Sequence, residues 1–314
     1  MGRIVVTGSV AFDTIMVFPG RFGEHILPDK THILNVSFLV DRLERRRGGT
    51  AANIAYTLAL LGERPLLCAA VGDDFAGYGA DLERAGVDTS TALRCADVAT
   101  ASCFITTDLD DNQISAFFPG AMGRAGSIDL RRIDAEIDTV VVAPDAPDAM
   151  AAHTEQAAEM GWRLVFAPAQ QIPSLGEEVL RRGLESAWMV VGNDYELEML
   201  RSRTGIGVEQ LRERGALVAL TRGGRGSELH SADGVVEVPV APVAGVVDPT
   251  GAGDAYLAGL LAGLRRGMDL AHAGRMGALA AAHVVEVRGP QAHSFTEDAF
   301  AARHRAAFAE PLAT

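Results

Sequence analysis

A loop of small residues near the C-terminal end of the sequence carries an aspartate directly behind it. Residues 247–254 read Val-Asp-Pro-Thr-Gly-Ala-Gly-Asp, and an apolar helical pattern follows them. A small-residue loop that enters a helix presents unpaired backbone amides and a partial positive charge, which together bind anions. An acid at such a site suits a neutral hydroxyl that loses its proton as a phosphoryl group arrives. The residues alone therefore leave two roles open for Asp254, a catalytic base and a helix cap. The predicted anion site consists of Gly251, Ala252 and Gly253.

A second small-residue motif lies near the N-terminus, where residues 47–53 read Arg-Gly-Gly-Thr-Ala-Ala-Asn ahead of another helical pattern. Glycines let a substrate approach the backbone, and the Asn53 amide can both donate to and accept from vicinal hydroxyls. Asp13, just after the first predicted strand, adds two acceptor oxygens, although a turn or cap role is its alternative. The two motifs therefore supply the groups that a polyhydroxylated substrate needs.

Both motifs resemble signatures of the ribokinase-like, or PfkB-type, family of carbohydrate and nucleoside kinases. Residues 248–254 resemble the C-terminal signature and residues 47–62 resemble the N-terminal one, in the family's order along the chain. The resemblance implies an α/β fold, with a three-layer α/β/α core around a mostly parallel sheet and a small β-sheet lid. It also implies an ATP-dependent kinase in which Asp254 activates the acceptor hydroxyl. The acceptor's other hydroxyls would be bound by Asp13, Gly48, Gly49 and Asn53, with Ser9 beside them.

Two further motifs follow predicted strands, at the strand ends where open α/β sheets bind ligands. Asn193-Asp-Tyr-Glu196 resembles the family's Asn-x-x-Glu motif, which implies that Glu196 supports Mg²⁺ through water. The same pattern is also a helix capping box. Residues 221–226 resemble the family's nucleotide loop. The nucleotide-binding candidates are Asn193, Glu196, Thr221, Arg222, Gly223 and Gly226.

The adenine of ATP would lie against the helix that carries His283 and against residues 284–289. A packed core histidine is the alternative for His283. Relatives often use potassium beside the glycine loop, so Asp248 and Thr250 are candidate K⁺ ligands.

Aromatic and amide side chains indicate which molecule accepts the phosphoryl group. Phe117 offers a ring for a flat base, and Gln170 and Gln171 follow a predicted strand with amides that match the edge of adenine. Residues 22–28, 37–41 and 118–122 add a resemblance to the bacterial adenosine kinase branch. Phe104 falls one position later than the aromatic wall expected there. Either the Phe104 ring still belongs to the site, with the strand shifted by one position, or the enzyme is less selective for the base of its nucleoside acceptor.

These motifs predict transfer of the γ-phosphoryl group of ATP to the 5′-hydroxyl of adenosine. The alternatives are a broader nucleoside kinase, a ribokinase- or fructokinase-like sugar kinase, and a nucleotide sensor without catalysis. An NAD-dependent dehydrogenase is disfavoured because the first strand is followed by Gly-Ser-Val-Ala-Phe and not by Gly-x-Gly-x-x-Gly.

Apolar runs that alternate with helical patterns predict βαβ units. The predicted strands are Ile4–Thr7, Leu66–Val71, Thr139–Val142, Leu164–Ala167, Met189–Val191 and Ala216–Thr221. Residues 14–40 and 89–118 lack a helical period and are predicted to form the β lid. The core would consist of residues 1–13, 41–88 and 119–314. The apolar stretch Ile33–Val40 predicts a lid edge through which a homodimer forms.

Composition excludes several classes of function. The 314 residues carry 28 basic and 41 acidic side chains, a net charge of −13, which disfavours nucleic-acid binding. The only lysine, Lys30, is not part of a P-loop. Three cysteines give no disulfide framework, and no signal peptide or run of about 18 apolar residues is present. We therefore expect a cytoplasmic enzyme without a membrane span.

Overall fold

An eight-stranded sheet forms the centre of the computed structural model, which describes residues 2–26 and 35–309. Its strands are β1 (Arg3–Thr7), β4 (Leu66–Cys68), β9 (Ile137–Val142), β10 (Arg163–Phe166), β11 (Ala187–Asn193), β12 (Leu217–Thr221), β13 (Ser227–Ser231) and β14 (Gly234–Val238). Their order is β14-β13-β12-β11-β10-β9-β1-β4. All neighbours from β12 to β4 are parallel, and β13 and β14 add an antiparallel hairpin at one edge.

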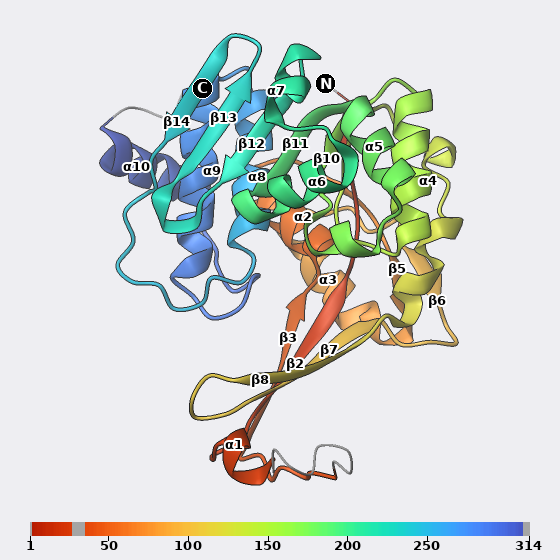
Figure 1. Ribbon diagram of the computed structural model, residues 1–314, viewed down its shortest axis with the longest axis vertical. Coiled ribbons are helices and arrows are strands. Elements are labelled where there is room, and N and C mark those ends of the chain that lie inside the picture. Colours follow the sequence, from red (N-terminus) through yellow and green to blue (C-terminus); the bar gives the residue numbers. More distant parts are fainter. Residues whose placement is uncertain (1, 27–34, 310–314) are drawn as a thin grey trace.

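Helices cover both faces of this sheet (Figure 1). One face packs against α2 (Thr50–Leu60), α3 (Ala76–Ala85), α8 (Ala252–Arg265), α9 (Leu270–Val285) and α10 (Glu297–Phe308). The other packs against α4 (Pro147–Glu159), α5 (Glu177–Ser186), α6 (Asp194–Thr204) and α7 (Val208–Glu213). Within β1, Val6 faces the first set and Val5 the second, as the strand pleat requires. The predicted three-layer α/β/α core is confirmed.

Glycines bring α8 and α9 into close contact. A Cβ on Gly259 of α8 would lie 2.7 Å from the Cα of Gly277 in α9, so only glycine allows this approach. The contact fixes α8 against the core and so positions its N-terminus at the site. No helix in the described ranges is both long enough and apolar enough to cross a bilayer.

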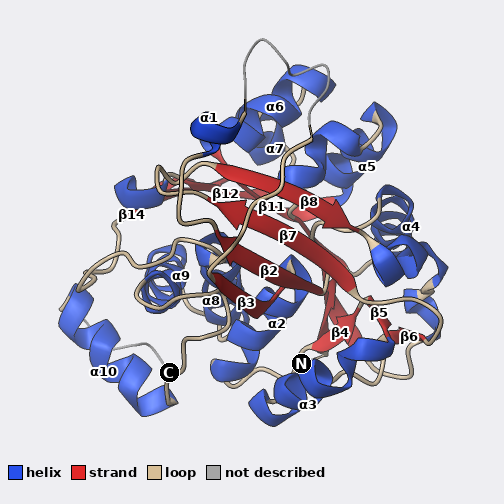
Figure 2. Ribbon diagram, turned by 90° about the horizontal axis from the view of Figure 1, so that it is seen from below, coloured by secondary structure: helices blue, strands red, loops and turns tan. Residues whose placement is uncertain are grey.

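A separate four-stranded sheet projects from the core as a lid (Figures 1 and 2). It contains β2 (Ala11–Val17), β3 (Arg42–Gly48), β7 (Ala101–Thr107) and β8 (Gln113–Phe118), in the order β3-β2-β7-β8. The short helix α1 (Phe22–His25) lies at its far end. A small parallel pair, β5 (Ala70–Gly72) and β6 (Leu93–Cys95), lies beside the core.

The lid strands differ from the predicted lid segments in three ways. β3, placed in the core by the sequence, pairs along its whole length with β2 and belongs to the lid sheet. Residues 89–100 contribute no lid strand. Of the predicted edge Ile33–Val40, residues 33–34 lie outside the described residues, and 35–40 form no strand. The predicted strand Leu66–Val71 is likewise two strands, β4 and β5, in two different sheets.

Candidate active site

The N-terminus of α8 is shaped by a left-handed glycine and an aspartate turn. Gly251 has φ 82°, and a Cβ there would lie 2.5 Å from the Cβ of Pro290. Asp248 accepts hydrogen bonds from the backbone N–H of Thr250 and of Gly289, each at 3.0 Å. The Ala252 N–H donates to the Pro249 carbonyl at 3.2 Å, so this amide closes the turn. Nothing lies within 4 Å of a Cβ built on Gly253, which leaves open space beside the first turn of the helix.

Asp254 lies in that first turn and is only partly exposed. The Asn53 side-chain amide donates to its Oδ2 at 2.8 Å. The pKa of Asp254 is raised to about 7, chiefly by burial and to a smaller extent by Glu196, while the hydrogen bond from Asn53 lowers it. A carboxyl group with a pKa near neutrality can accept a proton and release it again, as a general base must.

Asn53 is held by Gln291, which also donates to the Tyr78 hydroxyl, and the sequence analysis selected neither Gln291 nor Tyr78. Gln291 Nε2 donates to Asn53 Oδ1 at 2.8 Å, which leaves the Asn53 amide nitrogen to face Asp254. The Tyr78 hydroxyl donates to the Gly48 carbonyl at 2.8 Å. No sequence pattern marks Gln291 or Tyr78, because their partners lie far away along the chain.

Gly49 has φ 94°, and a Cβ on it would lie 2.6 Å from the Ser9 carbonyl oxygen. The Ser9 hydroxyl accepts from the Thr50 N–H at 3.1 Å and so caps α2. A Cβ on Gly48 would lie 2.7 Å from Asp13 Oδ2, so the Asp13 carboxylate lies over this glycine. Four predicted substrate ligands, Ser9, Asp13, Gly48 and Gly49, are therefore in one place.

Three cavities meet at this point. The first, of about 370 Å³, is lined by Asp13, Asn53 and the lid; the second, of about 260 Å³, by Asn193 and Glu196; the third, of about 500 Å³, lies between β12 and α9. Asp254 and Gly251 line both the first and the second cavity. Gly253 lines both the second and the third. The α8 N-terminus therefore lies at both junctions of one continuous cleft.

The first cavity is roofed by one face of the lid sheet. Asp13 and Cys103 pair across β2 and β7, and Cys103 pairs with Phe117 of β8, so all three side chains share a face and line the cavity. Phe104, one residue on, is on the opposite face and does not line the cavity, which contains Cys103 in its place. Burial raises the pKa of Asp13, while the Arg46 guanidinium lowers it.

The floor of the first cavity includes Gln170 and Gln171. Both lie in a 3₁₀ segment, Ala169–Ser174, that follows β10. Ala169 has φ +40°, an uncommon value for a residue with a side chain, so the backbone turns sharply just before the two amides.

The second cavity contains the Asn193–Glu196 pair. The Glu196 N–H donates to Asn193 Oδ1 at 2.8 Å, and the Asn193 N–H donates to Glu196 Oε2 at 2.9 Å, a reciprocal capping box at the start of α6. Both residues also line the cavity beside Asp254. No cluster of three His, Cys, Asp or Glu side chains suited to a metal occurs among the described residues. A single Glu196 fits Mg²⁺ that is bound mainly by substrate phosphates and water.

The third cavity is apolar and contains part of the predicted nucleotide loop. Thr221, Gly223 and Gly226 line it, as do Ala278 and Ala282 of α9. The sequence analysis missed its other wall, a loop that contributes Val240, Ala241, Val243 and Val246.

Two predicted nucleotide ligands are engaged elsewhere. Arg222 forms an ion pair with Glu228 and does not line the third cavity. His283 packs against Phe295 and Phe300, with ring centroids 4.7 and 5.8 Å away, and burial lowers its pKa to about 4. His283 is therefore a packed core residue at the contact between α9 and α10, and the pocket is lined by neighbouring alanines.

The carboxylate of the predicted potassium ligand Asp248 is already hydrogen-bonded. Both oxygens of Asp248 already accept backbone hydrogen bonds, and Arg46 Nη1 lies 3.4 Å from Oδ2. Each Asp248 oxygen keeps a further acceptor position, so K⁺ at Asp248 and Thr250 stays a prediction.

Comparison with known proteins places this geometry in a family. The pfkB family carbohydrate kinase pattern matches residues 3–297, so the chain belongs to this family and is an ATP-dependent kinase that phosphorylates a hydroxyl group. A nucleoside kinase of Methanothermobacter thermautotrophicus is 33% identical over 298 residues, covering 92% of this chain and 91% of that protein. An ATP-dependent ribose-1-phosphate kinase of Halopiger xanaduensis is 34% identical over 221 residues, 68% of this chain and 72% of the relative.

Among solved structures, the Burkholderia thailandensis nucleoside kinase in complex with inosine superposes with a TM-score of 0.87 at 36% identity, covering 98% of this chain and 99% of that one. The same enzyme in complex with ADP-inosine gives a TM-score of 0.86 at 37% identity, with 99% and 98% coverage. The fold predicted from the two signatures is thereby confirmed.

Proposed function

We propose that the protein is a nucleoside kinase that transfers the γ-phosphoryl group of ATP to the 5′-hydroxyl of a purine nucleoside. The observation that carries the proposal is the position of Asp254, whose carboxylate lines the acceptor cavity and the adjoining phosphate cavity at once. A base at that junction touches the hydroxyl at the point where the phosphoryl group arrives.

The steps follow from the three cavities. The ribose lies against Asp13, Gly49 and Asn53, with its 5′-oxygen toward Asp254, which accepts the proton as the oxygen attacks phosphorus. Backbone amides at the α8 N-terminus stabilise the negative charge that develops on the transferred group, except the predicted Ala252 N–H, which is used within the turn. The adenine of ATP occupies the apolar third cavity. Mg²⁺, supported through water by Glu196, would neutralise charge on the ATP phosphates.

Adenosine is the acceptor that we propose first. Phe117 supplies a ring for the base, and the amides of Gln170 and Gln171 can donate to and accept from its edge. An amide serves hypoxanthine equally well, and the B. thailandensis enzyme was solved with inosine. A broader nucleoside kinase is therefore the second candidate. The similarity to a ribose-1-phosphate kinase supports a sugar or sugar phosphate as the third.

Initial rates of ADP release decide among these acceptors. We expect adenosine and inosine to be phosphorylated with kcat/KM values at least about 100-fold above those of ribose, fructose and ribose 1-phosphate, because the sugars leave Phe117 and the glutamines without a partner. Faster turnover of any of the sugars would overturn the nucleoside assignment. A rate for inosine above that for adenosine would overturn only the choice of adenosine.

We also propose a homodimer formed through the outer face of the lid. Four apolar side chains on this face are 44–63% exposed: Leu43, Phe104, Ile114 and Phe118. Apolar side chains gathered on one face of a sheet are typical of a protein interface. Sedimentation equilibrium should give twice the 33.1 kDa chain mass, and Phe104→Ser should shift the equilibrium toward monomer. A wild-type protein that sediments only as a monomer would exclude the dimer.

A further inference from the structure

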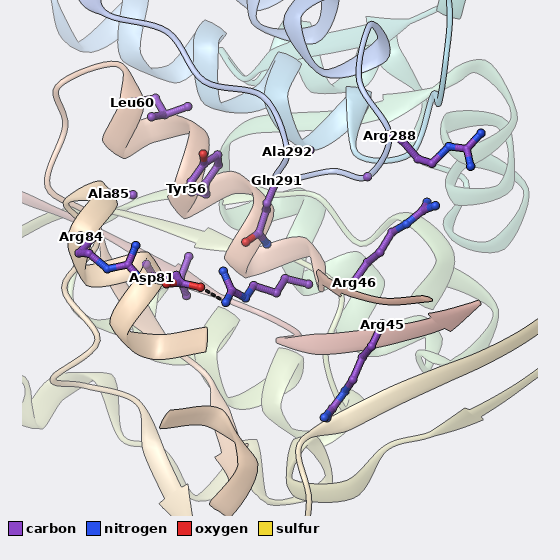
Figure 3. A pocket seen from close by; sticks show the side chains of 13 residues that line it. Arg45, Arg46, Tyr56, Leu60, Asp81, Arg84, Ala85, Arg288, Gln291 and Ala292 are labelled. Carbon is purple, nitrogen blue, oxygen red and sulfur yellow. Dashed lines mark ion pairs between the residues drawn. The ribbon is translucent and has the colours of Figure 1, made fainter. Parts of the chain in front are cut away.

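A second large cavity lies behind the acceptor cavity, at the root of the lid (Figure 3). Its volume is about 630 Å³, larger than each of the three cavities of the catalytic cleft. Its walls come from β3, α2, α3 and residues 288–292. That last segment separates the two spaces, since Pro290 lines the acceptor cavity whereas Gly289 and Gln291 line this one.

The charged residues of this cavity, which we call the arginine cavity, are five arginines and one aspartate. They are Arg45, Arg46, Arg47, Arg84, Arg288 and Asp81. The whole chain carries a net charge of −13, so a positive cavity is a local feature and does not reflect the composition.

Ion pairs do not neutralise these arginines. Together with Arg42, which shares Glu44 with Arg46, the five arginines contact only four carboxylates: Glu44, Asp74, Asp81 and Asp248. Two of the six arginine charges therefore have no carboxylate of their own in an ion pair, although Asp13 also lies near Arg46.

The two surplus charges lie at identifiable places. Arg47 and Arg84 both pair with the single carboxylate of Asp81. Arg288 is exposed and has no ion pair or hydrogen bond to any residue of the described ranges. Figure 3 shows Arg46 and Arg288 at one end of the cavity and Arg84 with Asp81 at the other, with Gln291 between them. Arg45 points away from this space, toward Asp74.

We propose that the arginine cavity is a second anion site, distinct from the catalytic one, which binds a phosphate monoester dianion. Arg288, which has no ion pair within the described ranges, and the two arginines that share Asp81 are the guanidinium groups least neutralised by carboxylates, and planar guanidinium groups bind phosphate oxygens in pairs. Tyr56, Leu60 and Leu82 add an apolar wall. That wall gives an organic substituent a place to pack, so a nucleoside 5′-monophosphate suits the cavity better than inorganic phosphate does.

The site also joins the lid to the core. Arg46 and Arg47 belong to the lid strand β3, whereas Arg288 belongs to the core segment that contains Pro290 and Gln291. Gln291 holds Asn53, which holds Asp254. A dianion that bridges Arg288 to the lid arginines would fix the lid root against the acceptor cavity. If the proposed function holds, nucleoside binding is then coupled to anion binding.

Equilibrium dialysis of the full chain with labelled inorganic phosphate counts the sites, and a separate series uses labelled AMP. We expect two equivalents of phosphate for the wild type, one in the catalytic cleft and one in the arginine cavity. AMP fits both the acceptor and the ATP cavities, so the AMP series is used only to compare its affinity at the second site. The double variant Arg84→Gln/Arg288→Gln should retain one equivalent. Of residues 284–289, predicted to contact adenine, only Val285 lines the third cavity, and neither Arg84 nor Arg288 lines any of the three cavities of the cleft. Turnover without added phosphate should therefore be unchanged.

The matched control is the double variant Arg132→Gln/Arg64→Gln, which removes two positive charges from exposed arginines outside the arginine cavity. Arg132 matches Arg84 because each pairs with an aspartate three residues away. This control should still bind two equivalents. Tighter binding of AMP than of phosphate at the second site supports a nucleotide ligand, and equal affinities support phosphate itself. A single equivalent in the wild type, or two in the Arg84/Arg288 variant, would overturn the site.

Coupling is measured as the Kd for adenosine with and without saturating phosphate. We expect phosphate to tighten adenosine binding on the order of fivefold in the wild type and not at all in the Arg84/Arg288 variant. An equal effect in both proteins would overturn the coupling. If the protein bound no nucleoside, the proposed function would fail, but the count of phosphate sites would still decide the arginine cavity.

Discussion

The acceptor cavity has two walls of different construction. On the core side, Asp254 receives a hydrogen bond from Asn53, Asn53 receives one from Gln291, and glycines 49 and 251 allow contacts that a Cβ would prevent. On the lid side, Phe117 is 52% exposed and projects from a sheet whose other face is also open. The groups that must be placed accurately therefore lie on the core, and the lid supplies contact area.

This difference separates chemistry from binding. A base is effective only when its carboxylate is held within hydrogen-bond reach of the reacting oxygen, and the core network provides that. A ring that stacks on a base tolerates small movements, because stacking depends on overlapping area and not on one bond direction. Substitutions on the core wall should lower turnover or folding stability, and those on the lid should change substrate affinity.

Asp254→Asn should have the largest effect. The amide keeps the size of the side chain but cannot accept the hydroxyl proton, so kcat should fall by about 10²–10⁴ while adenosine affinity changes little. Steady-state kinetics and a direct binding titration measure the two quantities. The control Asp233→Asn removes an exposed carboxylate that lines none of the three cavities and should leave kcat unchanged. Wild-type turnover in the Asp254 variant would exclude it as the base.

Gly49→Ala should destabilise the core wall itself. Its Cβ would meet Ser9 O and Val10 Cα at 2.6 Å, and its φ of 94° is unfavourable for alanine, so we expect a loss of about 3 kcal/mol or more of unfolding free energy. Gly161→Ala is the matched control, because Gly161 also has positive φ (67°) but nothing lies within 4 Å of its Cβ. Urea unfolding should show a loss of about 1 kcal/mol for that control. Equal losses would show that the close packing at Gly49 is unimportant.

Phe117→Ala tests the lid wall. Removal of a ring that stacks on the base should cost about 1–3 kcal/mol of binding, a rise in KM of roughly 5- to 150-fold with kcat nearly constant. The neighbour Phe118 is 46% exposed, close to the 52% of Phe117, but it is on the opposite face of β8. Phe118→Ala should therefore leave KM unchanged. If both substitutions raised KM alike, the assignment of the two lid faces would be wrong.

The core wall was more predictable from the sequence than the lid. Parallel strands buried on both faces form apolar runs such as Thr139–Val142, and the glycine loops mark the starts of α2 and α8. β3 reads Arg-Leu-Glu-Arg-Arg-Arg-Gly and has no apolar alternation, because it is a strand only through pairing with β2. Local pattern therefore could not reveal it.

The same limit applies to individual site residues. Gln291 reaches Asn53 across 238 positions in the sequence, and no local motif encodes such a contact. Cys103 and Phe104 are consecutive residues of one strand, so their side chains lie on opposite faces of the lid sheet. An error of one residue in the expected position therefore selects the side chain on the wrong face. His283 has a residue type that suits base recognition, but its ring is covered by α10.

A pH series tests whether the burial of Asp254 is part of its function. With a pKa of about 7 in the folded protein, the carboxyl group is protonated below that pH and cannot act as a base, so kcat/KM should rise about tenfold per pH unit up to about pH 7 and then level off. The contribution of Asp254 to the unfolding free energy depends on pH in the opposite direction to kcat/KM, because it falls as the pH rises. The ordinary value is 3.8, so between pH 3.8 and about 7 the folded state keeps a proton that the unfolded state releases. The unfolding free energy that this group contributes is therefore lost as pH rises through that window.

Asp254→Asn removes this pH-dependent loss, so urea unfolding should show the variant gaining stability over the wild type from pH 5 to pH 8. Asp145, also buried with a pKa raised to about 7, is present in both proteins and cancels in the difference. A stability difference that stays constant with pH would mean that Asp254 is an ordinary surface carboxylate. The core wall would then have lost the desolvated base that distinguishes it from the lid.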